Sequence, residues 1–169
     1  VCGRYGVCAV VENVLAERNP APGPRVLLAA HYDSVPAGPG GSDDGVGVAT
    51  LLEVARALRH RATRLPTLLL FSDGEEAGLL GAEAFVRDEL PKYEIAAVVN
   101  VEARGTSGAA LLFETSGPNA WLVAAFARAS PRPVTSSLFP AVYQRLPNDT
   151  DLSVFARAGI PGVNFANIG

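Results

Sequence analysis

The sequence predicts one α/β domain, a three-layer sandwich with a mixed, largely parallel central sheet and helices on both faces. Short continuous apolar runs, typical of strands buried on both faces, alternate along the chain with stretches whose apolar residues recur at helical spacing. The chain has 169 residues, enough for one domain with a sizeable core. No internal repeat, linker or low-complexity tract divides it.

The first half of the chain begins this alternation. β-branched residues predict a strand over residues 7–16, which ends at a Pro/Gly-rich turn over 19–24. The short apolar run over 25–30 predicts a strand that is buried on both faces. Apolar residues at helical spacing then predict a helix over 45–61, and a second buried strand covers 67–71.

The second half continues in the same way. A helix is expected over residues 79–90, ended by Pro91, because proline interrupts a helix. A third buried strand is expected over 95–101. The remaining expected elements are a strand at 109–113, helices at 118–129 and 152–158, and a last strand at 161–165.

The composition excludes several classes of protein. A hydrophobic fraction of 49% with 18% charged residues is inconsistent with intrinsic disorder. A net charge of −3 argues against a nucleic-acid partner, which requires a basic face. No apolar run approaches the roughly 18 residues of a membrane-spanning helix. Since the chain has no Met and starts at Val1 without a signal-peptide pattern, we expect a piece of a longer protein, cut at both ends.

The two cysteines, Cys2 and Cys8, lie close together near the start of the chain. They can form a disulfide in an oxidising compartment, or remain reduced as small buried residues. The further Cys or His partners of a zinc ribbon are missing. The sequence leaves the first two alternatives open.

Chemistry-bearing residues gather where the buried strands end. Parallel strands present their carboxyl ends at one edge of a sheet, so we expect these side chains to meet in one crevice. Two like charges ~4 Å apart repel by about 4 kcal/mol at an effective dielectric near 20, so such a cluster must hold protons or cations. Histidine with carboxylates suits zinc or another divalent ion. The residues are His31, Asp33, Asp43, Asp44, Glu75, Glu76 and Glu102.

Each of these residues taken alone has a structural explanation. A single histidine is usually structural, but Asp33 follows His31 closely, and a metal-bound histidine commonly donates its other N–H to a carboxylate. Asp43-Asp44 can cap the next helix, and Glu75-Glu76 can be solvated or first-turn acids. Glu102 ends a very apolar strand, where an acid is rarely buried unless paired. Only the combination is specific.

Four motifs follow one another along the chain: His31-x-Asp33, Gly41-Ser42-Asp43-Asp44-Gly45-Val46-Gly47, Glu75-Glu76 and Asn100-Val101-Glu102. In this order they resemble the M28 family of zinc aminopeptidases. Matches at Ser116 to Val123, Asp149-Thr150-Asp151 and Gly159-Ile160-Pro161-Gly162 resemble the branch of endoplasmic reticulum metallopeptidase 1 and its bacterial relatives. The resemblance implies that residues 1–169 are a single peptidase catalytic domain of the zinc-dependent exopeptidase fold.

The resemblance implies a first zinc site. His31 would ligate this ion, Asp33 would orient the histidine ring, and Glu102 would be a second ligand. The family usually has Asp where Glu102 stands, although the branch named above has Glu. It also usually has Ser at Val46, whose side chain is not a ligand, so this departure is small.

The resemblance also implies a second zinc site and a catalytic base. Asp43 would bridge the two ions, and Glu76 would ligate the second. Glu75 would be the general base that acts on a metal-activated bridging water, so that N-terminal peptide bonds are hydrolysed. The peptide bond between Asp43 and Asp44 is expected to be cis.

One ligand that the resemblance implies is not in the chain. The second zinc of the family takes a histidine from a segment that follows the stretch matching residues 159–169. The other histidine here, His60, lies between two arginines at the carboxyl end of the helix expected over 45–61, where cations offset the helix dipole. We do not expect His60 to be a ligand. We therefore expect the chain alone to build the first site, half-build the second and turn over no substrate.

Other functions on this fold are a glutaminyl-cyclase-like acyltransferase with one zinc and a receptor-like ectodomain without metal. His31 together with Glu102 disfavours the first, and retention of the expected ligands disfavours the second. A nucleotide-binding domain is not expected, because the glycine-rich loop over 40–47 is acidic and has no Walker lysine. Whether Arg104 contacts a substrate carboxylate or forms a salt bridge stays open.

The expected partner is a peptide substrate, with no nucleic acid. The resemblance points to an extracytoplasmic or membrane-anchored protein, with membrane contact only through segments outside these residues. The preferred substrate residue and the oligomeric state cannot be read from the sequence.

Overall fold

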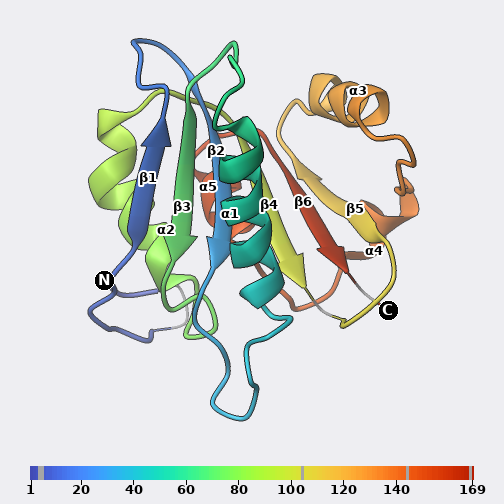
Figure 1. The fold of residues 1–169 in the computed structure, drawn as a ribbon. Helices are drawn as coiled ribbons and strands as arrows, with labels where there is room; N and C mark the ends of the chain where they lie inside the picture. The colour runs from blue at the N-terminus through green and yellow to red at the C-terminus, as the bar shows by residue number, and fades with distance from the viewer. Residues whose placement is uncertain (4–5, 104, 144, 168) are drawn as a thin grey trace.

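A six-stranded sheet forms the middle layer of the protein (Figure 1). The computed structural model describes residues 1–3, 6–103, 105–143, 145–167 and 169. The strand order is β1-β3-β2-β4-β6-β5, in which the four central strands are parallel and both edge strands are antiparallel to their neighbours. The strands are β1 (Val14–Arg18), β2 (Arg25–His31), β3 (Thr67–Ser72), β4 (Ile95–Ala103), β5 (Ala110–Ser116) and β6 (Gly162–Asn167).

Helices cover both faces of the sheet, which confirms the predicted three-layer α/β arrangement (Figure 1). α1 (Gly45–Leu58) and α3 (Ala120–Ala129) pack on one face; α2 (Leu80–Ala84) and α5 (Asp151–Arg157) pack on the other. The short helix α4 (Leu138–Tyr143) lies beside β5. None of the described helices is long and apolar enough to cross a membrane.

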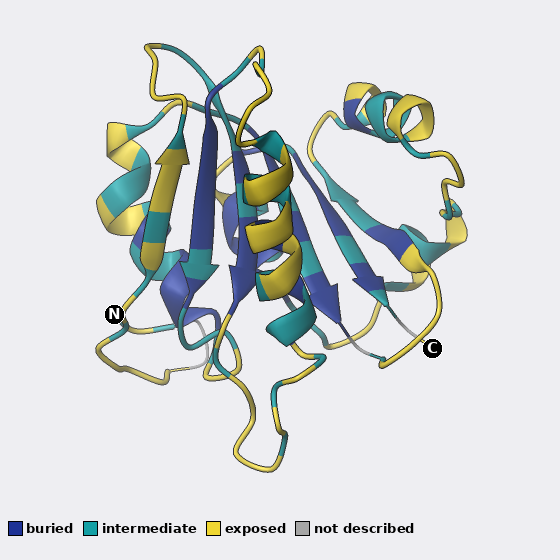
Figure 2. Ribbon diagram, in the orientation of Figure 1, coloured by how far each residue is buried: buried dark blue, intermediate teal, exposed yellow. Residues whose placement is uncertain are grey.

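The central strands are buried on both faces, which explains their continuous apolar sequences (Figure 2). Leu27 of β2 packs with Phe85 and Phe155 on the α2 and α5 side, where the two phenylalanine rings meet edge to face at 6.0 Å. The next-but-two residue, Ala30, packs with Leu51 of α1 on the opposite side. Alternate side chains thus enter two separate cores.

Several predicted boundaries are wrong. The strand predicted over 7–16 begins at Val14 and runs to Arg18, because it pairs with β3, which is only six residues long and opposes nothing before Val14. The helix predicted to end before Pro91 is α2 followed by a π-helical turn and a 3₁₀ turn that reaches Lys92. Proline is tolerated there because the first turn of a helix needs no N–H donor from it.

The N-terminal loop lies against the segment that follows β3. Cys2 and Cys8 form a disulfide, which decides the alternative that the sequence left open. A Cβ atom on Gly3 would lie 2.4 Å from the carbonyl oxygen of Gly78, so only glycine permits this close approach.

Candidate metal centre

His31 ends β2, the strand that has β3 on one side and β4 on the other. Its side chain is 1% exposed. Nδ1 lies 3.0 Å from the backbone carbonyl oxygen of Asp33, and since a carbonyl only accepts, Nδ1 carries the proton and donates it. The other ring nitrogen, Nε2, lies 3.1 Å from Oδ1 of Asp43 and 3.7 Å from Oε2 of Glu102. In the neutral ring, Nε2 therefore offers its lone pair toward two carboxylates.

Asp33 connects His31 to the loop after β3. Its carboxylate accepts the backbone N–H of Glu75 at 3.0 Å and that of Glu76 at 3.1 Å. The same carboxylate lies 3.4 Å from Nδ1 of His31. Asp33 thus contacts the ring of His31, as expected, and its carboxylate also positions the backbone of the two glutamates.

Asp43 and Asp44 have different places, and the peptide bond between them is cis, as expected. Asp43 is half exposed beside His31. Asp44 is buried at the N-cap of α1, where its carboxylate accepts the N–H of Gly47 at 2.9 Å and the N–H of His31 at 3.3 Å. The capping explanation therefore holds for Asp44, whereas Asp43 faces the cluster.

A buried polar ladder runs from Glu102 across three strands. Nδ2 of Asn100 donates to Oε1 of Glu102 at 3.3 Å and to Oδ1 of Asn164 on β6 at 3.2 Å. Nδ2 of Asn164 donates in turn to Glu114 of β5 at 3.1 Å and to Thr150 at 2.9 Å. The ladder holds one oxygen of Glu102 and leaves Oε2 facing His31.

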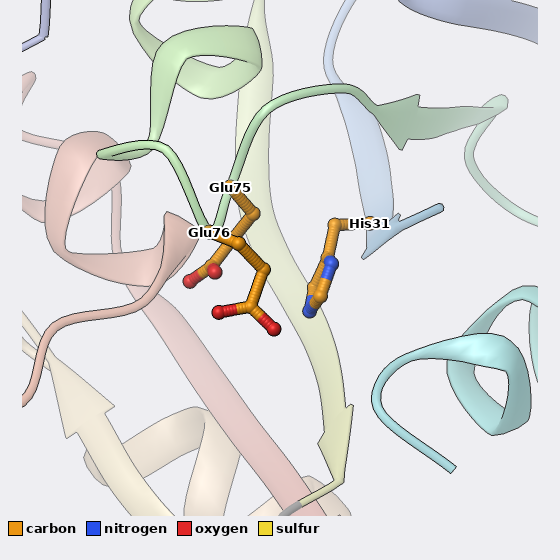
Figure 3. Close-up of side chains that lie close together, drawn as sticks. All are labelled: His31, Glu75 and Glu76. Atoms are coloured by element: carbon orange, nitrogen blue, oxygen red, sulfur yellow. The ribbon is translucent and has the colours of Figure 1, made fainter. Parts of the chain in front are cut away.

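Glu75 and Glu76 lie side by side on the loop after β3, across from the ring of His31, and the carboxylate of Glu76 points toward this ring (Figure 3). One donor atom from each of these three residues lies within 4.8 Å of the others. A second such set is His31, Asp43 and Glu102. The structure thus brings together all the site residues that the sequence predicted.

Asp151, at the start of α5, is a neighbour of the cluster for which the sequence predicted no role, although its motif was recognised. Its side chain is fully buried; Oδ2 accepts the hydroxyl of Ser72 at 2.5 Å, and Oδ1 has no hydrogen-bond partner among the described residues. His60, by contrast, is exposed beyond the carboxyl end of α1, while the cluster lies at the opposite end of that helix. Arg104 lies outside the described residues.

The carboxylates repel one another strongly. Burial, together with the charges of Asp151 and Glu102, raises the pKa of Glu75 to about 9. Burial, helped by Glu102, likewise raises the pKa of Asp44 to about 8 and that of Asp151 to about 7. For His31, burial lowers the pKa, but hydrogen bonds that its ring donates to the surrounding carboxylates outweigh burial, and the net shift of its pKa is upward. Without a cation, the folded cluster retains protons near neutral pH.

Because the folded cluster holds protons near neutral pH, the stability of the metal-free protein should depend on pH. Because the folded-state pKa values of Glu75, Asp44 and Asp151 lie above their ordinary values, the folded state binds more protons than the unfolded state, and stability falls as pH rises toward 9. We expect Tm to drop by about 5 °C or more between about pH 6 and pH 8.5.

Differential scanning fluorimetry with and without one equivalent of zinc measures this effect. Zinc competes with these protons, so its stabilising effect should be larger at the higher pH. A metal-free protein that is more stable at the higher pH would contradict the charge repulsion described here.

The donor set matches what a divalent ion needs. An imidazole nitrogen and several carboxylate oxygens converge from three adjacent strands and the loops that follow them, and the acids gain from a cation that offsets their repulsion. The fold and the cluster together are those of an α/β domain with a candidate metal centre.

Comparison with known proteins identifies the family. Residues 13–169 match the model of peptidase family M28, and the chain belongs to this family. It is 35% identical over 165 residues to human endoplasmic reticulum metallopeptidase 1, covering 94% of this chain and 18% of the relative. It is 37% identical over 167 residues to a vacuolar membrane protease of Candida albicans, covering 95% and 20%. The chain thus spans about a fifth of the length of these relatives.

Solved structures have the same fold. A glutaminyl cyclase from Porphyromonas gingivalis superposes with a TM-score of 0.74 at 21% identity, over 99% of this chain and 65% of the other. A zinc aminopeptidase from Bacillus subtilis superposes with a TM-score of 0.71 at 24% identity, over 91% and 39%. At these identities the likeness concerns the fold, including the mixed sheet.

Proposed function

We propose that the protein is a zinc-dependent aminopeptidase whose centre contains His31, Asp43, Glu76 and Glu102 as metal ligands. The observation that carries the proposal is the fixed ring of His31. Its Nδ1 donates to Asp33, so Nε2 faces the carboxylates of Asp43 and Glu102. Family membership and the names of the relatives support a peptidase.

Zinc bound here would act as a Lewis acid and lower the pKa of bound water. Glu75 is the proposed general base, which takes a proton from the attacking water and passes it to the leaving amine. The carboxylate of Asp33 positions Glu75 by accepting a hydrogen bond from the backbone N–H of Glu75.

The proposal includes a second zinc, for which Asp43 and Glu76 would supply ligands. Asp43 is half exposed, so part of its carboxylate is accessible beside His31. His31 is the one histidine in the cluster among the described residues, and the second ion requires a further ligand from elsewhere. On this proposal, residues 1–169 alone have no turnover.

A one-zinc acyltransferase is the second candidate, because the cyclase from P. gingivalis has the same fold. The two donor sets, His31 with Asp43 and Glu102 and His31 with Glu75 and Glu76, share the same histidine, so the measured zinc content decides between one ion and two. A receptor-like domain without metal would have no need of such a repulsive cluster.

The test is zinc content together with a substrate panel, using the full-length protein. We expect about two zinc ions per chain by mass spectrometry, and release of the fluorophore from aminoacyl-methylcoumarin substrates but not from their N-acetylated forms. One zinc with cyclisation of N-terminal glutamine would favour the acyltransferase, and no zinc would favour the receptor-like domain.

A further inference from the structure

The stretch from Asp73 to Gly81 carries both glutamates of the candidate centre, and we call it the glutamate loop. It follows β3 and ends in the first turn of α2. Three of its residues, Gly74, Gly78 and Leu79, have positive φ angles of 69°, 114° and 61°. This left-handed region disfavours a residue with a side chain such as Leu79, so contacts from outside must hold the loop in this conformation.

Asn13 joins the two ends of the glutamate loop. Its Oδ1 accepts the backbone N–H of Asp73 at 3.1 Å, and its Nδ2 donates to the carbonyl oxygen of Gly81 at 2.8 Å. A side-chain amide is suited to this task, because it offers an acceptor and a donor at the same time. Asn13 directly precedes β1, whose pairing with β3 begins at Val14, so its side chain extends the support of the loop beyond the sheet.

The backbone on the N-terminal side of this asparagine is itself fixed. The N–H of Glu12 donates to Oδ2 of Asp73 at 2.9 Å. The carbonyl oxygen of Glu12 accepts the hydroxyl of Tyr32, the residue after His31, at 2.6 Å. The segment before β1 is therefore tied both to the glutamate loop and to the end of the strand that carries the proposed histidine ligand.

The disulfide-closed loop, which the Cys2–Cys8 bond forms, is a second support. Among its described residues, Gly3 packs so closely against Gly78 that a Cβ atom on Gly3 would overlap the carbonyl oxygen of Gly78. Val7 lines a hollow of about 420 Å³ that Glu75 also lines. Both cysteines are exposed, so a reductant can reach the bond that closes this loop.

These contacts complement the bonds from Asp33, which accepts the N–H groups of Glu75 and Glu76. Asp33 fixes the backbone at the two glutamates, whereas Asn13 fixes the two ends of the loop. A general base acts only within hydrogen-bond reach of the proton, about 2.6–3.2 Å. A displacement of about 1 Å can lower a rate about a hundredfold, so the position of this loop matters for the proposed reaction.

We propose that Asn13 is a positioning residue for Glu75 and Glu76, and that the disulfide-closed loop is a second support of the same glutamate loop. The effect on catalysis rests on the proposed aminopeptidase function. The effect on the loop itself does not, because it is present in the metal-free protein as well.

Hydrogen exchange of the metal-free full-length protein tests the role of Asn13 in the loop. In Asn13→Ala we expect the peptide covering residues 73–81 to exchange about tenfold faster, because two hydrogen bonds that hold its ends are lost. A peptide from β6 should keep its wild-type rate, which separates local loosening from lower global stability. Unchanged exchange over residues 73–81 would overturn the inference.

Asn119→Ala is the matched control for this variant. Asn119 is also a half-buried asparagine whose Nδ2 donates a hydrogen bond, to Thr115 at 2.7 Å, but it lies at the start of α3 on the other face of the sheet. Its removal should leave the exchange of residues 73–81 unchanged. Faster exchange of these residues in Asn119→Ala would overturn the assignment to Asn13.

Kinetics of the zinc-loaded full-length protein test the effect on the reaction. Asn13→Ala should lower kcat about tenfold and change KM less than about threefold, since the asparagine acts on proton transfer and not on substrate binding. Wild-type kcat in this variant would overturn the positioning role.

If the wild-type protein hydrolyses no substrate, the aminopeptidase function fails, and zinc affinity still decides the role of Asn13. Because Glu76 is a proposed ligand, Asn13→Ala should then bind zinc at least about tenfold more weakly by calorimetry. Equal zinc affinity of the two proteins would overturn the positioning role.

Reduction tests the second support. Treatment of the metal-free protein with a phosphine reductant should speed exchange of residues 73–81 at least about twofold, and the double variant Cys2→Ser, Cys8→Ser should show the same rate without reductant. The reductant should have no further effect on the double variant, which excludes other disulfides of the full-length protein as the cause. Unchanged exchange in both experiments would overturn the role of the disulfide-closed loop.

Discussion

Glu75→Ala is expected to lower kcat about a thousandfold or more while the protein keeps its zinc. A positioned general acid–base contributes roughly 10²–10⁴ in rate, and Glu75 is the carboxylate assigned to both proton transfers. Zinc should stay because His31, Asp43, Glu76 and Glu102 are the assigned ligands. Steady-state kinetics with a leucine substrate, paired with zinc content by mass spectrometry, measures the two effects separately.

This experiment distinguishes a base from a ligand, because a carboxylate oxygen of Glu75 lies within 4.8 Å of the donor atoms of His31 and Glu76 and could itself bind the ion. Loss of zinc in Glu75→Ala would show that Glu75 is a ligand and not the base. Glu53→Ala is the matched control, since Glu53 is an exposed glutamate on α1 that pairs with Arg56 and should affect neither readout. Full activity in Glu75→Ala would remove the proposed role.

His31→Ala is expected to weaken zinc binding at least about a hundredfold, since even a residue that only supports a ligand is worth about 10–100-fold in metal affinity. The histidine is the one nitrogen donor of the cluster among the described residues, and Asp33 holds its ring in place. Isothermal titration calorimetry with zinc measures the change in zinc affinity. The rise in Tm on adding zinc should disappear as well.

His60→Ala supplies the control for this variant. His60 is exposed beyond the carboxyl end of α1, a helix length from the cluster, so its removal should leave zinc affinity and Tm unchanged. Wild-type zinc affinity in His31→Ala, or its loss in His60→Ala, would show that the metal is bound elsewhere.

The sequence was most informative where residues are buried on both faces. β2, β3 and β4 were each predicted within two residues at either end, because burial on both sides of a sheet leaves a continuous apolar run. The edge strand β1 was misplaced, since half of its side chains face solvent and its limits depend on pairing with β3. α4 was missed because it is six residues long, too short for a periodic pattern, and contains Pro140.

The candidate site, too, was predicted only in part from the sequence. The order of the motifs identified its residues, because each follows or ends a strand whose sequence is distinctive. The support from Asn164 and Glu114 was not predicted, since it depends on the register that places Asn100, Asn164 and Glu114 opposite one another across three strands. A polar residue inside an apolar run, as at Asn164, was the only signal available.

The strand order has a consequence for when the metal centre forms. β2, which carries His31, lies between two strands that come later in the chain, and Glu75 and Glu102 reach the histidine only after β3 and β4 have paired with it. A nascent or partly unfolded chain therefore lacks the complete set of proposed ligands. In a zinc finger the metal drives a short peptide to fold, whereas on the proposed ligand assignment β2, β3 and β4 must pair before the centre is complete.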